Sequence, residues 1–338
     1  MSTATYEPVI GPEYKSDEWY ALRVYDPDRK ERPIVFGASD AAAACGQSPY
    51  GSPMELYLQY RGQVEKEFTE EQEEQMRLGL LFEPIILNEY EDREGCKVDR
   101  DLPMLLSPDH YFMGASLDGI ARKDTEKWAV DSKSSNFRMF DNSGEDINKF
   151  GDAGTDQVPT YILMQGQQQM AVAGVDRVDF PVMIDARSIK IYRVDRNEEL
   201  IQQIITAEKE LAERIVNGEP PEPSWSHTGT RRLLNEMFGC KTGEVTELTV
   251  DDKALWDEAQ ALGLVSKDAE CRIKEIKNEL YWRLGDNELG RFPDSNLELK
   301  RTIVKDSVVK QSDIDKLTKT LGQVRRKGHH RLGCRKIK

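Results

Sequence analysis

The sequence predicts an α/β protein in which a central sheet is flanked by helices, followed by a mostly helical C-terminal region with a small sheet. Two long stretches, 69–95 and 198–216, have the mixed apolar and charged pattern of amphipathic helices. Short apolar pieces typical of strands lie between them: 104–107, 111–122, 127–135 and 179–194. A Pro- and Ser-rich stretch, 219–228, is typical of a linker. We therefore expect one domain over 1–218 and an accessory domain over 229–338.

Three short helices are expected before residue 60. Residues 16–24 form a helix capped by a serine. An alanine-rich turn of helix follows, with Ser39 or Asp40 as its N-cap. Ser52 and Pro53 are the cap and first residue of the third helix.

The long helix that starts at Thr69 has a capping box formed with Gln72. Its apolar side chains recur with helical spacing and form a stripe: Leu78, Leu81, Phe82, Ile85 and Ile86. Glu83 lies beside this stripe, and Pro84 introduces a possible kink.

A polar, Gly-rich segment, 136–156, predicts a mobile loop. The next helix begins near Pro159 and has Gln165 and Gln169 on one face. A hairpin then turns at 185–188.

After the linker, the pattern predicts two more helical segments, a hairpin and a final strand. They are a helix from Asp251 to Leu284 broken near Gly263, a hairpin over 289–305, a short helix over 312–321 and a basic strand over 331–338.

Composition limits the class of protein. The chain has 338 residues, a net charge of −14, five dispersed cysteines without a C-x-x-C pair, and four histidines. These counts argue against a disulfide framework, a zinc ribbon or a His-based metal site. The sequence has no run of 18 apolar residues and no signal peptide pattern at its start, so we expect a cytoplasmic protein without membrane spans.

The charge is unevenly distributed. Residues 299–338 hold 13 Lys and Arg against three Asp, a local balance of +10, whereas the remainder carries −24. An acidic body repels DNA and a basic segment attracts it, although a solvated basic tail is an equally good interpretation.

The tripeptide Asp131-Ser132-Lys133 ends an apolar strand and follows the Asp118-Gly119 pair. In a strand, Asp131 and Lys133 share a face, and Trp128 and Val130 point to the core side. A carboxylate pair with a lysine suits metal-assisted cleavage of a phosphodiester. An ion pair at a solvated strand end is the alternative.

The order of several short motifs is more specific than any one of them. Arg32 precedes GASDAAAACGQSPYGSPMELY, and GLLFEP, SLDGI, DSK, Y-x-x-x-Q-x-Q and a hairpin follow. Over residues 32–216 this order resembles the YqaJ-like viral recombinase family, which includes phage lambda exonuclease and lies within the PD-(D/E)-x-K nucleases. A narrower resemblance is to the exonucleases of SXT-type integrating elements. The resemblance implies the PD-(D/E)-x-K core, with a mixed, mainly antiparallel sheet.

The resemblance implies roles for particular residues. Glu83, Asp118 and Asp131 match the metal-binding carboxylates, with the Ser132 carbonyl also facing a metal. Asp131 stands where the family usually has glutamate, which shortens the side chain by one methylene. Lys133 matches the catalytic lysine, either as a base or as a group that positions water, and Gln165 matches the glutamine near the nucleophilic water.

Three further positions match the family's pocket for the 5′-phosphate of DNA: Arg32, Ser39 and Ser116. A guanidinium and two hydroxyls suit a phosphate, and the helix that opens at Asp40 would add its N-terminal dipole. Separately, Ser39 has a simpler reading as a helix cap and Arg32 as a surface arginine.

The implied function is an alkaline 5′→3′ exonuclease that acts on double-stranded DNA ends with two Mg²⁺ ions, for which Mn²⁺ substitutes. It would release mononucleotides and leave a 3′ single strand for a single-strand annealing protein, as a homo-oligomeric ring of three or four subunits. The alternatives are an endonuclease of the same superfamily and a non-catalytic protein that binds DNA ends.

Overall fold

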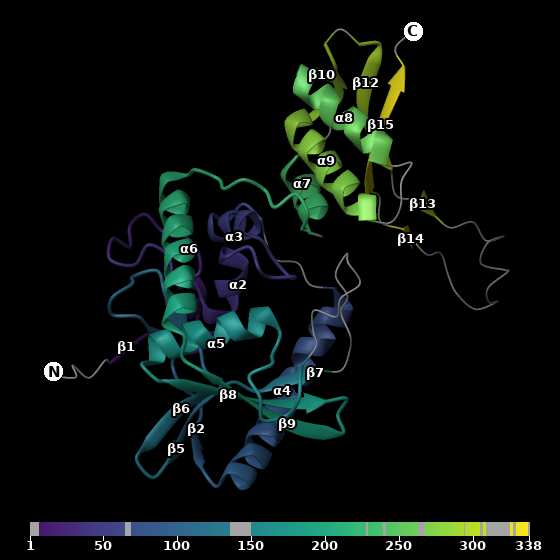
Figure 1. The fold of residues 1–338 in the computed structure, drawn as a ribbon. Coiled ribbons are helices and arrows are strands. Elements are labelled where there is room, and N and C mark those ends of the chain that lie inside the picture. Colours follow the sequence, from purple (N-terminus) through teal and green to yellow (C-terminus); the bar gives the residue numbers. More distant parts are fainter. Residues whose placement is uncertain are drawn as a thin grey trace. The chain divides into compact units, whose positions relative to one another are not determined.

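The structure is a computed structural model, and it divides into two compact units, Met1–His227 and Thr228–Lys338 (Figure 1). It describes residues 7–64, 69–135, 150–227, 229–238, 241–262, 268–293, 295–304, 307–308, 325–326 and 329–336. The division between the units falls inside the Pro- and Ser-rich stretch 219–228.

The first unit is built on a mixed sheet. Its strands are β2 (Lys97–Asp99), β5 (Gly119–Lys123), β6 (Glu126–Val130), β7 (Lys133–Ser135), β8 (Arg177–Ile184) and β9 (Ser188–Asp195). The pairs β2–β5, β5–β6 and β8–β9 are antiparallel, whereas β6 and β7 both run parallel to β8. The predicted α/β class with a mixed, mainly antiparallel sheet is confirmed, as is the hairpin that turns after Ile184.

Strands β6 and β7 are two parts of one strand, interrupted at Asp131 and Ser132. Val130 pairs with Asp179 and Lys133 pairs with Val182, so two residues lie between the two pairs on both strands. The ladder therefore opens without a change of register, and the alternation of side chains continues across the gap.

The two faces of this sheet are covered by different helices. On one face, Leu87 and Tyr90 of α4 (Glu70–Glu94) pack with Trp128 and Val130. On the other face, Gly166 of α5 (Thr160–Ala173) lies against β8. Trp128 and Val130 thus point into a core, as predicted, and the opposite face receives the side chains in phase with Asp131.

Further helices stack beyond α5: α2 (Ala41–Ala44), α3 (Pro53–Tyr60) and α6 (Glu198–Asn217). Figure 1 shows them on the side of α5 that faces away from the sheet. The short helix α1 (Asp17–Leu22) and a small sheet of β1 (Val9–Ile10), β3 (Leu105–Leu106) and β4 (Gly114–Ala115) complete the unit.

Most predicted helix ends are confirmed by their caps. The hydroxyls of Ser16 and Ser52 accept bonds from the third residue of their helices, and Thr69 and Gln72 form the predicted capping box. Gly218 ends α6 in the left-handed conformation, with φ of 76°.

Two predictions about helices need correction. Asp40 is the N-cap residue of the four-residue α2, as one of the two predicted candidates, but it ends a 3-10 turn, Ala38–Asp40, and its side chain makes no capping bond to α2. In α4, Leu81 and Ile85 from the predicted apolar stripe are each 54% exposed, because the helix reaches the sheet only from about Ile86 onward.

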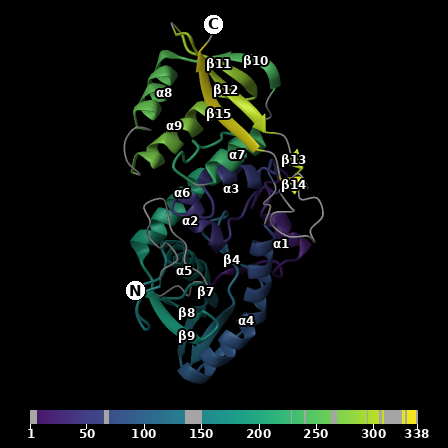
Figure 2. The ribbon, with the colours of Figure 1, turned by 90° about the vertical axis from the view of Figure 1, so that its right-hand side faces the viewer.

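The second unit combines helices with a small sheet, as predicted (Figure 2). Its elements are α7 (Thr230–Met237), β10 (Lys241–Glu247), α8 (Val250–Leu262), α9 (Asp268–Leu284), β11 (Asn287–Arg291), β12 (Leu297–Val304), β13 (Ser307–Val308), β14 (Arg325–Arg326) and β15 (His329–Lys336). The four-stranded sheet has the order β10-β11-β12-β15. Trp256, Ile276 and Leu280 belong to its core.

The β11–β12 hairpin agrees with the sequence analysis, and the basic final strand is β15, whereas the predicted helix break near Gly263 lies outside the described residues. Most of the predicted mobile loop, 136–149, and the predicted helix over 312–321 lie outside the described residues. Among the helices described, none has the length and apolar character needed to cross a membrane.

Candidate active site

Asp131 and Lys133 form the centre of the candidate site. Lys133 Nζ lies 2.7 Å from Asp131 Oδ1, and the Asp131 side chain is buried. Their shared strand face, which the D-x-K spacing predicted, brings them together across the interruption between β6 and β7.

Two glutamines of α5 hold the other oxygen of Asp131. Gln165 Nε2 and Gln169 Nε2 donate to Asp131 Oδ2 at 2.7 and 3.0 Å. They lie one turn apart, on the same face of the helix. Gln167 and Gln168 instead bond main-chain groups elsewhere, so only two of the four neighbouring glutamines hold Asp131.

Asp118 is tied to the same segment. Its Oδ2 accepts bonds from the backbone N–H and the hydroxyl of Ser132, both at 2.8 Å. The residue after Asp118 is glycine, and a Cβ at this position would lie 2.2 Å from a methyl carbon of Val98. The Asp-Gly pair is therefore required by packing against β2 as well as by the position of the carboxylate.

Glu83 belongs to the same electrostatic environment. Burial raises the pKa of Glu83, and the charge of Asp131 raises it further. For Asp118, burial followed by repulsion from Asp131 raises the pKa to about 7, and Glu83 adds to the shift. The three predicted carboxylates thus repel one another, which is the repulsion that a divalent cation relieves.

The donor set suits a hard cation such as Mg²⁺, because carboxylate oxygens are the ligands it prefers. Within the described parts of the chain, however, no three His, Cys, Asp or Glu side chains are close enough to share one ion. Asp118 is bonded to Ser132, and Asp131 is bonded to Lys133, so the two carboxylates are held by adjacent residues of one segment.

Lys133 is held in its charged form. Burial alone would lower its pKa, but the charges of Asp131 and Asp118 outweigh that effect and raise the pKa above its ordinary value. An ammonium group can position a water molecule or a phosphate oxygen, whereas a general base must be neutral.

The residues predicted to bind a 5′-phosphate have different protein partners in the structure. Arg32 donates to the carbonyl oxygens of Tyr111 at 3.0 Å and Ser107 at 2.6 Å, so it ties a loop together. Ser116 Oγ accepts a bond from Trp19 Nε1 at 3.2 Å, and Ser39 is exposed on its 3-10 turn.

Arg23 is a residue that the sequence analysis missed. Its guanidinium lies 4.9 Å from the centre of the Trp19 ring and bonds Asp40 at 2.6 Å. A Cβ on Gly37 would lie 2.9 Å from it. Arg23 is therefore beside the turn that carries Ser39 and, through Trp19, beside Ser116. The four-residue spacing of Trp19 and Arg23, at the end of a short helix, is the sequence signal that could have identified it.

Tyr14 was also missed. Burial raises its pKa, and the charges of Asp118 and Glu83 raise it further, so the segment before α1 lies near the carboxylates. Lys15 Nζ lies 5.0 Å from the centre of the Tyr14 ring, and its charge lowers the pKa of Glu83.

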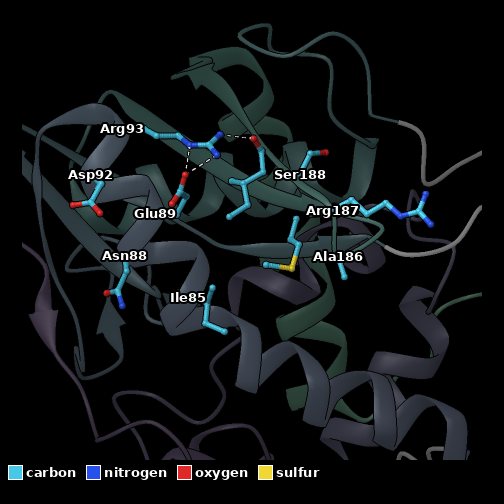
Figure 3. A pocket seen from close by; sticks show the side chains of 10 residues that line it. Ile85, Asn88, Glu89, Asp92, Arg93, Ala186, Arg187 and Ser188 are labelled. Atoms are coloured by element: carbon cyan, nitrogen blue, oxygen red, sulfur yellow. Dashed lines mark hydrogen bonds and ion pairs between the residues drawn. The ribbon is translucent and has the colours of Figure 1, made fainter.

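Two cavities lie on the first unit. One, of about 240 Å³, has Ser39 and Gln165 among its lining residues. The other, of about 400 Å³, lies between α4 and the β8–β9 hairpin (Figure 3). In this second cavity, Arg93 bonds Glu89 and the carbonyl of Ile189, and Arg187 points away from them. None of the predicted site residues lines it, so it is separate from the carboxylates.

Comparison with known proteins finds a family profile that matches part of the chain. Residues 24–176 match the profile of the YqaJ-like viral recombinase domain. The uncharacterized protein YqaJ of Bacillus subtilis is 25% identical over 281 residues, which cover 82% of this chain and 81% of that protein. The relatives named here include no protein of an SXT-type element, so that narrower resemblance is unsupported.

Two solved structures are similar to the chain. One is an alkaline exonuclease, LHK-Exo, from Laribacter hongkongensis, with 19% identity and a TM-score of 0.42. The match covers 60% of this chain and 94% of that one. The other, LHK-Exo in complex with dAMP, gives the same values.

Proposed function

We propose, from the premise that residues 24–176 form a YqaJ-like viral recombinase domain, that this protein is a metal-dependent 5′→3′ exonuclease acting on double-stranded DNA. The observation that carries the proposal is the hydrogen-bonded network of Asp118, Ser132, Asp131 and Lys133 inside that domain. A pair of carboxylates, one buried and one half-buried, beside a charged lysine suits a phosphodiester, whose oxygens need both a cation and a donor.

Each residue of the network has a role in this proposal. Asp118 and Asp131, joined by Glu83 and the Ser132 carbonyl, would hold two Mg²⁺ or Mn²⁺ ions. When bound, such ions neutralise charge on the scissile phosphate and make bound water more acidic. Gln165 and Gln169 fix the Asp131 carboxylate, since partners of a ligand set its orientation. Lys133 Nζ, kept protonated by its neighbours, holds the attacking water or a phosphate oxygen.

We assign the 5′-phosphate to Arg23, Ser39 and Ser116. Trp19 contacts both Arg23 and Ser116, and the Ser39 turn adjoins Arg23 through Gly37. Asp40 accepts a hydrogen bond from one nitrogen of the Arg23 guanidinium. The guanidinium has further N–H donors, which can bind a phosphate. Arg32 then has the structural task of joining Ser107 to Tyr111.

The proposal also includes the biological setting that the family implies. The product would be a 3′ single strand for a single-strand annealing protein, made by a ring of identical subunits around the duplex.

The test uses the purified full chain with Mg²⁺ and three DNAs: a linear duplex labelled at one 5′ end, the same duplex without 5′-phosphates, and a covalently closed circle. We expect rapid release of labelled mononucleotide, slower attack without the phosphate, and an intact circle. Cutting of the circle would replace the proposal by an endonuclease. Binding of ends without any cleavage in Mg²⁺ or Mn²⁺ would replace it by a DNA-end-binding protein.

Matched variants assign the chemistry to the network. Lys133→Ala and Asp118→Asn should lower the rate by about 10²-fold or more while end binding persists. Lys127→Ala, on the exposed part of the same strand, and Asp124→Asn, in the exposed turn between β5 and β6, should keep full activity. If Lys127→Ala lowers the rate as much as Lys133→Ala does, or Asp124→Asn as much as Asp118→Asn, the assigned site is contradicted.

A further inference from the structure

The cavity of about 240 Å³ touches both functional parts of the candidate site. Ser39 lines it on the side of Arg23, and Gln165, which bonds Asp131, lines it on the side of the carboxylates. Its volume is below the roughly 300 Å³ at which pockets for drug-sized ligands begin, so it suits one nucleoside.

Two tyrosines form an aromatic wall of this cavity. The rings of Tyr50 and Tyr161 meet edge to face, with centroids 5.2 Å apart, and their hydroxyls hydrogen-bond. Tyr161 lies four residues before Gln165 on α5, so both project from the same face of the helix. Tyr50 is 41% exposed, so one part of its ring is braced and another part is available to a ligand.

The charge of the cavity argues against a phosphate inside it. Its lining contains the carboxylates of Asp40 and Glu55 and no lysine or arginine. An anion entering it would meet like charge, whereas an uncharged base would meet an aromatic ring and hydrogen-bond acceptors.

We propose that Tyr50, braced by Tyr161, stacks on the base of the 5′-terminal nucleotide and thereby sets the position of the scissile phosphate. This inference rests on the proposed exonuclease function. In an enzyme that removes one nucleotide from a 5′ end, a single nucleoside separates the terminal phosphate from the phosphate that is cut. Ser39 at one side of the cavity and Gln165 at the other match those two phosphates.

Stacking on tyrosine gives no preference for one base, because every base has a π-face. Tyr50 therefore positions the strand end without restricting the sequences that the enzyme degrades. We expect its loss to weaken the hold on the end by about tenfold.

The test measures stacking without cleavage. A duplex carries 2-aminopurine as its 5′-phosphorylated terminal base, and EDTA removes divalent ions. Binding of the wild type should quench the fluorescence of that base. Tyr50→Ala should lose the quenching while still binding the duplex, and Tyr50→Phe, which keeps the ring, should retain it.

A second measurement separates stacking from a change in fold. Replacing the terminal nucleotide by an abasic one should slow the wild type about tenfold and leave Tyr50→Ala at its already reduced rate. Quenching that persists in Tyr50→Ala, or an abasic effect equal in both proteins, would overturn the stacking role. If the wild type cleaves no DNA, the exonuclease proposal fails; normal cleavage with quenching that is independent of Tyr50 refutes this inference alone.

Discussion

At the scale of single residues, Asp131 receives three hydrogen bonds, and their distribution decides where a ligand can bind. Gln165 and Gln169 both donate to Oδ2, and Lys133 donates to Oδ1. A carboxylate oxygen accepts about two partners, so Oδ1 keeps room for one more. A metal ion bound by Asp131 would therefore use Oδ1, the same oxygen that accepts the bond from Lys133.

The first residue-scale prediction concerns the two candidate arginines. The ratio of rates on 5′-phosphorylated and unphosphorylated ends should fall about tenfold or more, toward one, in Arg23→Gln, because a charge-assisted hydrogen bond to the phosphate is lost. Arg32→Gln should keep the ratio and lower the melting temperature, since two carbonyls lose their donor. Each ratio is taken within one variant, so partial unfolding cancels. If Arg32→Gln lowers the ratio and Arg23→Gln keeps it, the result would indicate that Arg32 binds the phosphate.

The second concerns Asp118 and pH. Its pKa is about 7 in the folded protein and about 3.9 in an unfolded chain. The raised value means that its contribution to stability is complete below about pH 4 and is lost as the pH rises through about 7. Without metal, Asp118→Asn should therefore melt increasingly above the wild type between pH 4 and 8.

Metal should reverse this difference. Mg²⁺ binds the ionised carboxylate, so it should stabilise the wild type more at pH 8 than at pH 6, and should have little effect on Asp118→Asn. A wild type whose melting temperature ignores Mg²⁺ at both pH values would contradict the metal assignment. Thermal melts with and without EDTA provide the measurement.

At the scale of elements, two helix glycines have opposite surroundings. A Cβ on Gly166 would lie 2.7 Å from Phe180 and 2.8 Å from Val178, whereas a Cβ on Gly79 of α4 would meet nothing within 4 Å. Gly166→Ala should lower the free energy of unfolding by about 1–3 kcal/mol through overpacking. Gly79→Ala should raise it by about 0.5–1 kcal/mol, because alanine favours a helix. Urea denaturation measures both free energies of unfolding. If the two substitutions change them in the same direction, α5 does not approach β8 as described.

Elements with strong local signals were predictable from the sequence. The cap at Ser52, the capping box at Thr69 and the glycine at 218 depend on neighbours within four residues. Helix α7 was missed because Gly229 gives it no side-chain cap, and β10 because its polar sequence contains Gly243. The exposure of the first half of α4 depends on where the sheet ends, which local pattern does not contain.

The same distinction holds within the candidate site. Asp131 and Lys133 are two residues apart, so strand geometry alone predicts their contact. Arg32 bonds carbonyls 75 and 79 residues away, and the contacts of Arg23 with Asp40 and Gly37 depend on how the chain returns after α1. Such contacts are decided by tertiary structure, so motif order alone could not identify Arg23 as a neighbour of the Ser39 turn.

At the scale of the whole molecule, the two units have separate hydrophobic cores, and we expect calorimetry to resolve two unfolding transitions. Leu280→Ala, in the core of the second unit, and Phe180→Ala, under α5 in the first, each remove a fully buried side chain. Each change should cost about 2–5 kcal/mol and lower one transition by the order of 10 °C. The other transition should stay in place. A single transition that moves in both variants would show that the units unfold together.

The interruption between β6 and β7 also bears on how such a sequence can change over generations. Because the register with β8 is kept across Asp131 and Ser132, the number of residues between Val130 and Lys133 is fixed by the neighbouring strand. A substitution at Ser132 alters one side chain, whereas an inserted or deleted codon would turn Lys133 and everything after it in β7 to the opposite face. The length of this segment is therefore fixed by its neighbour, and a library that varies loop lengths in this protein should leave it untouched.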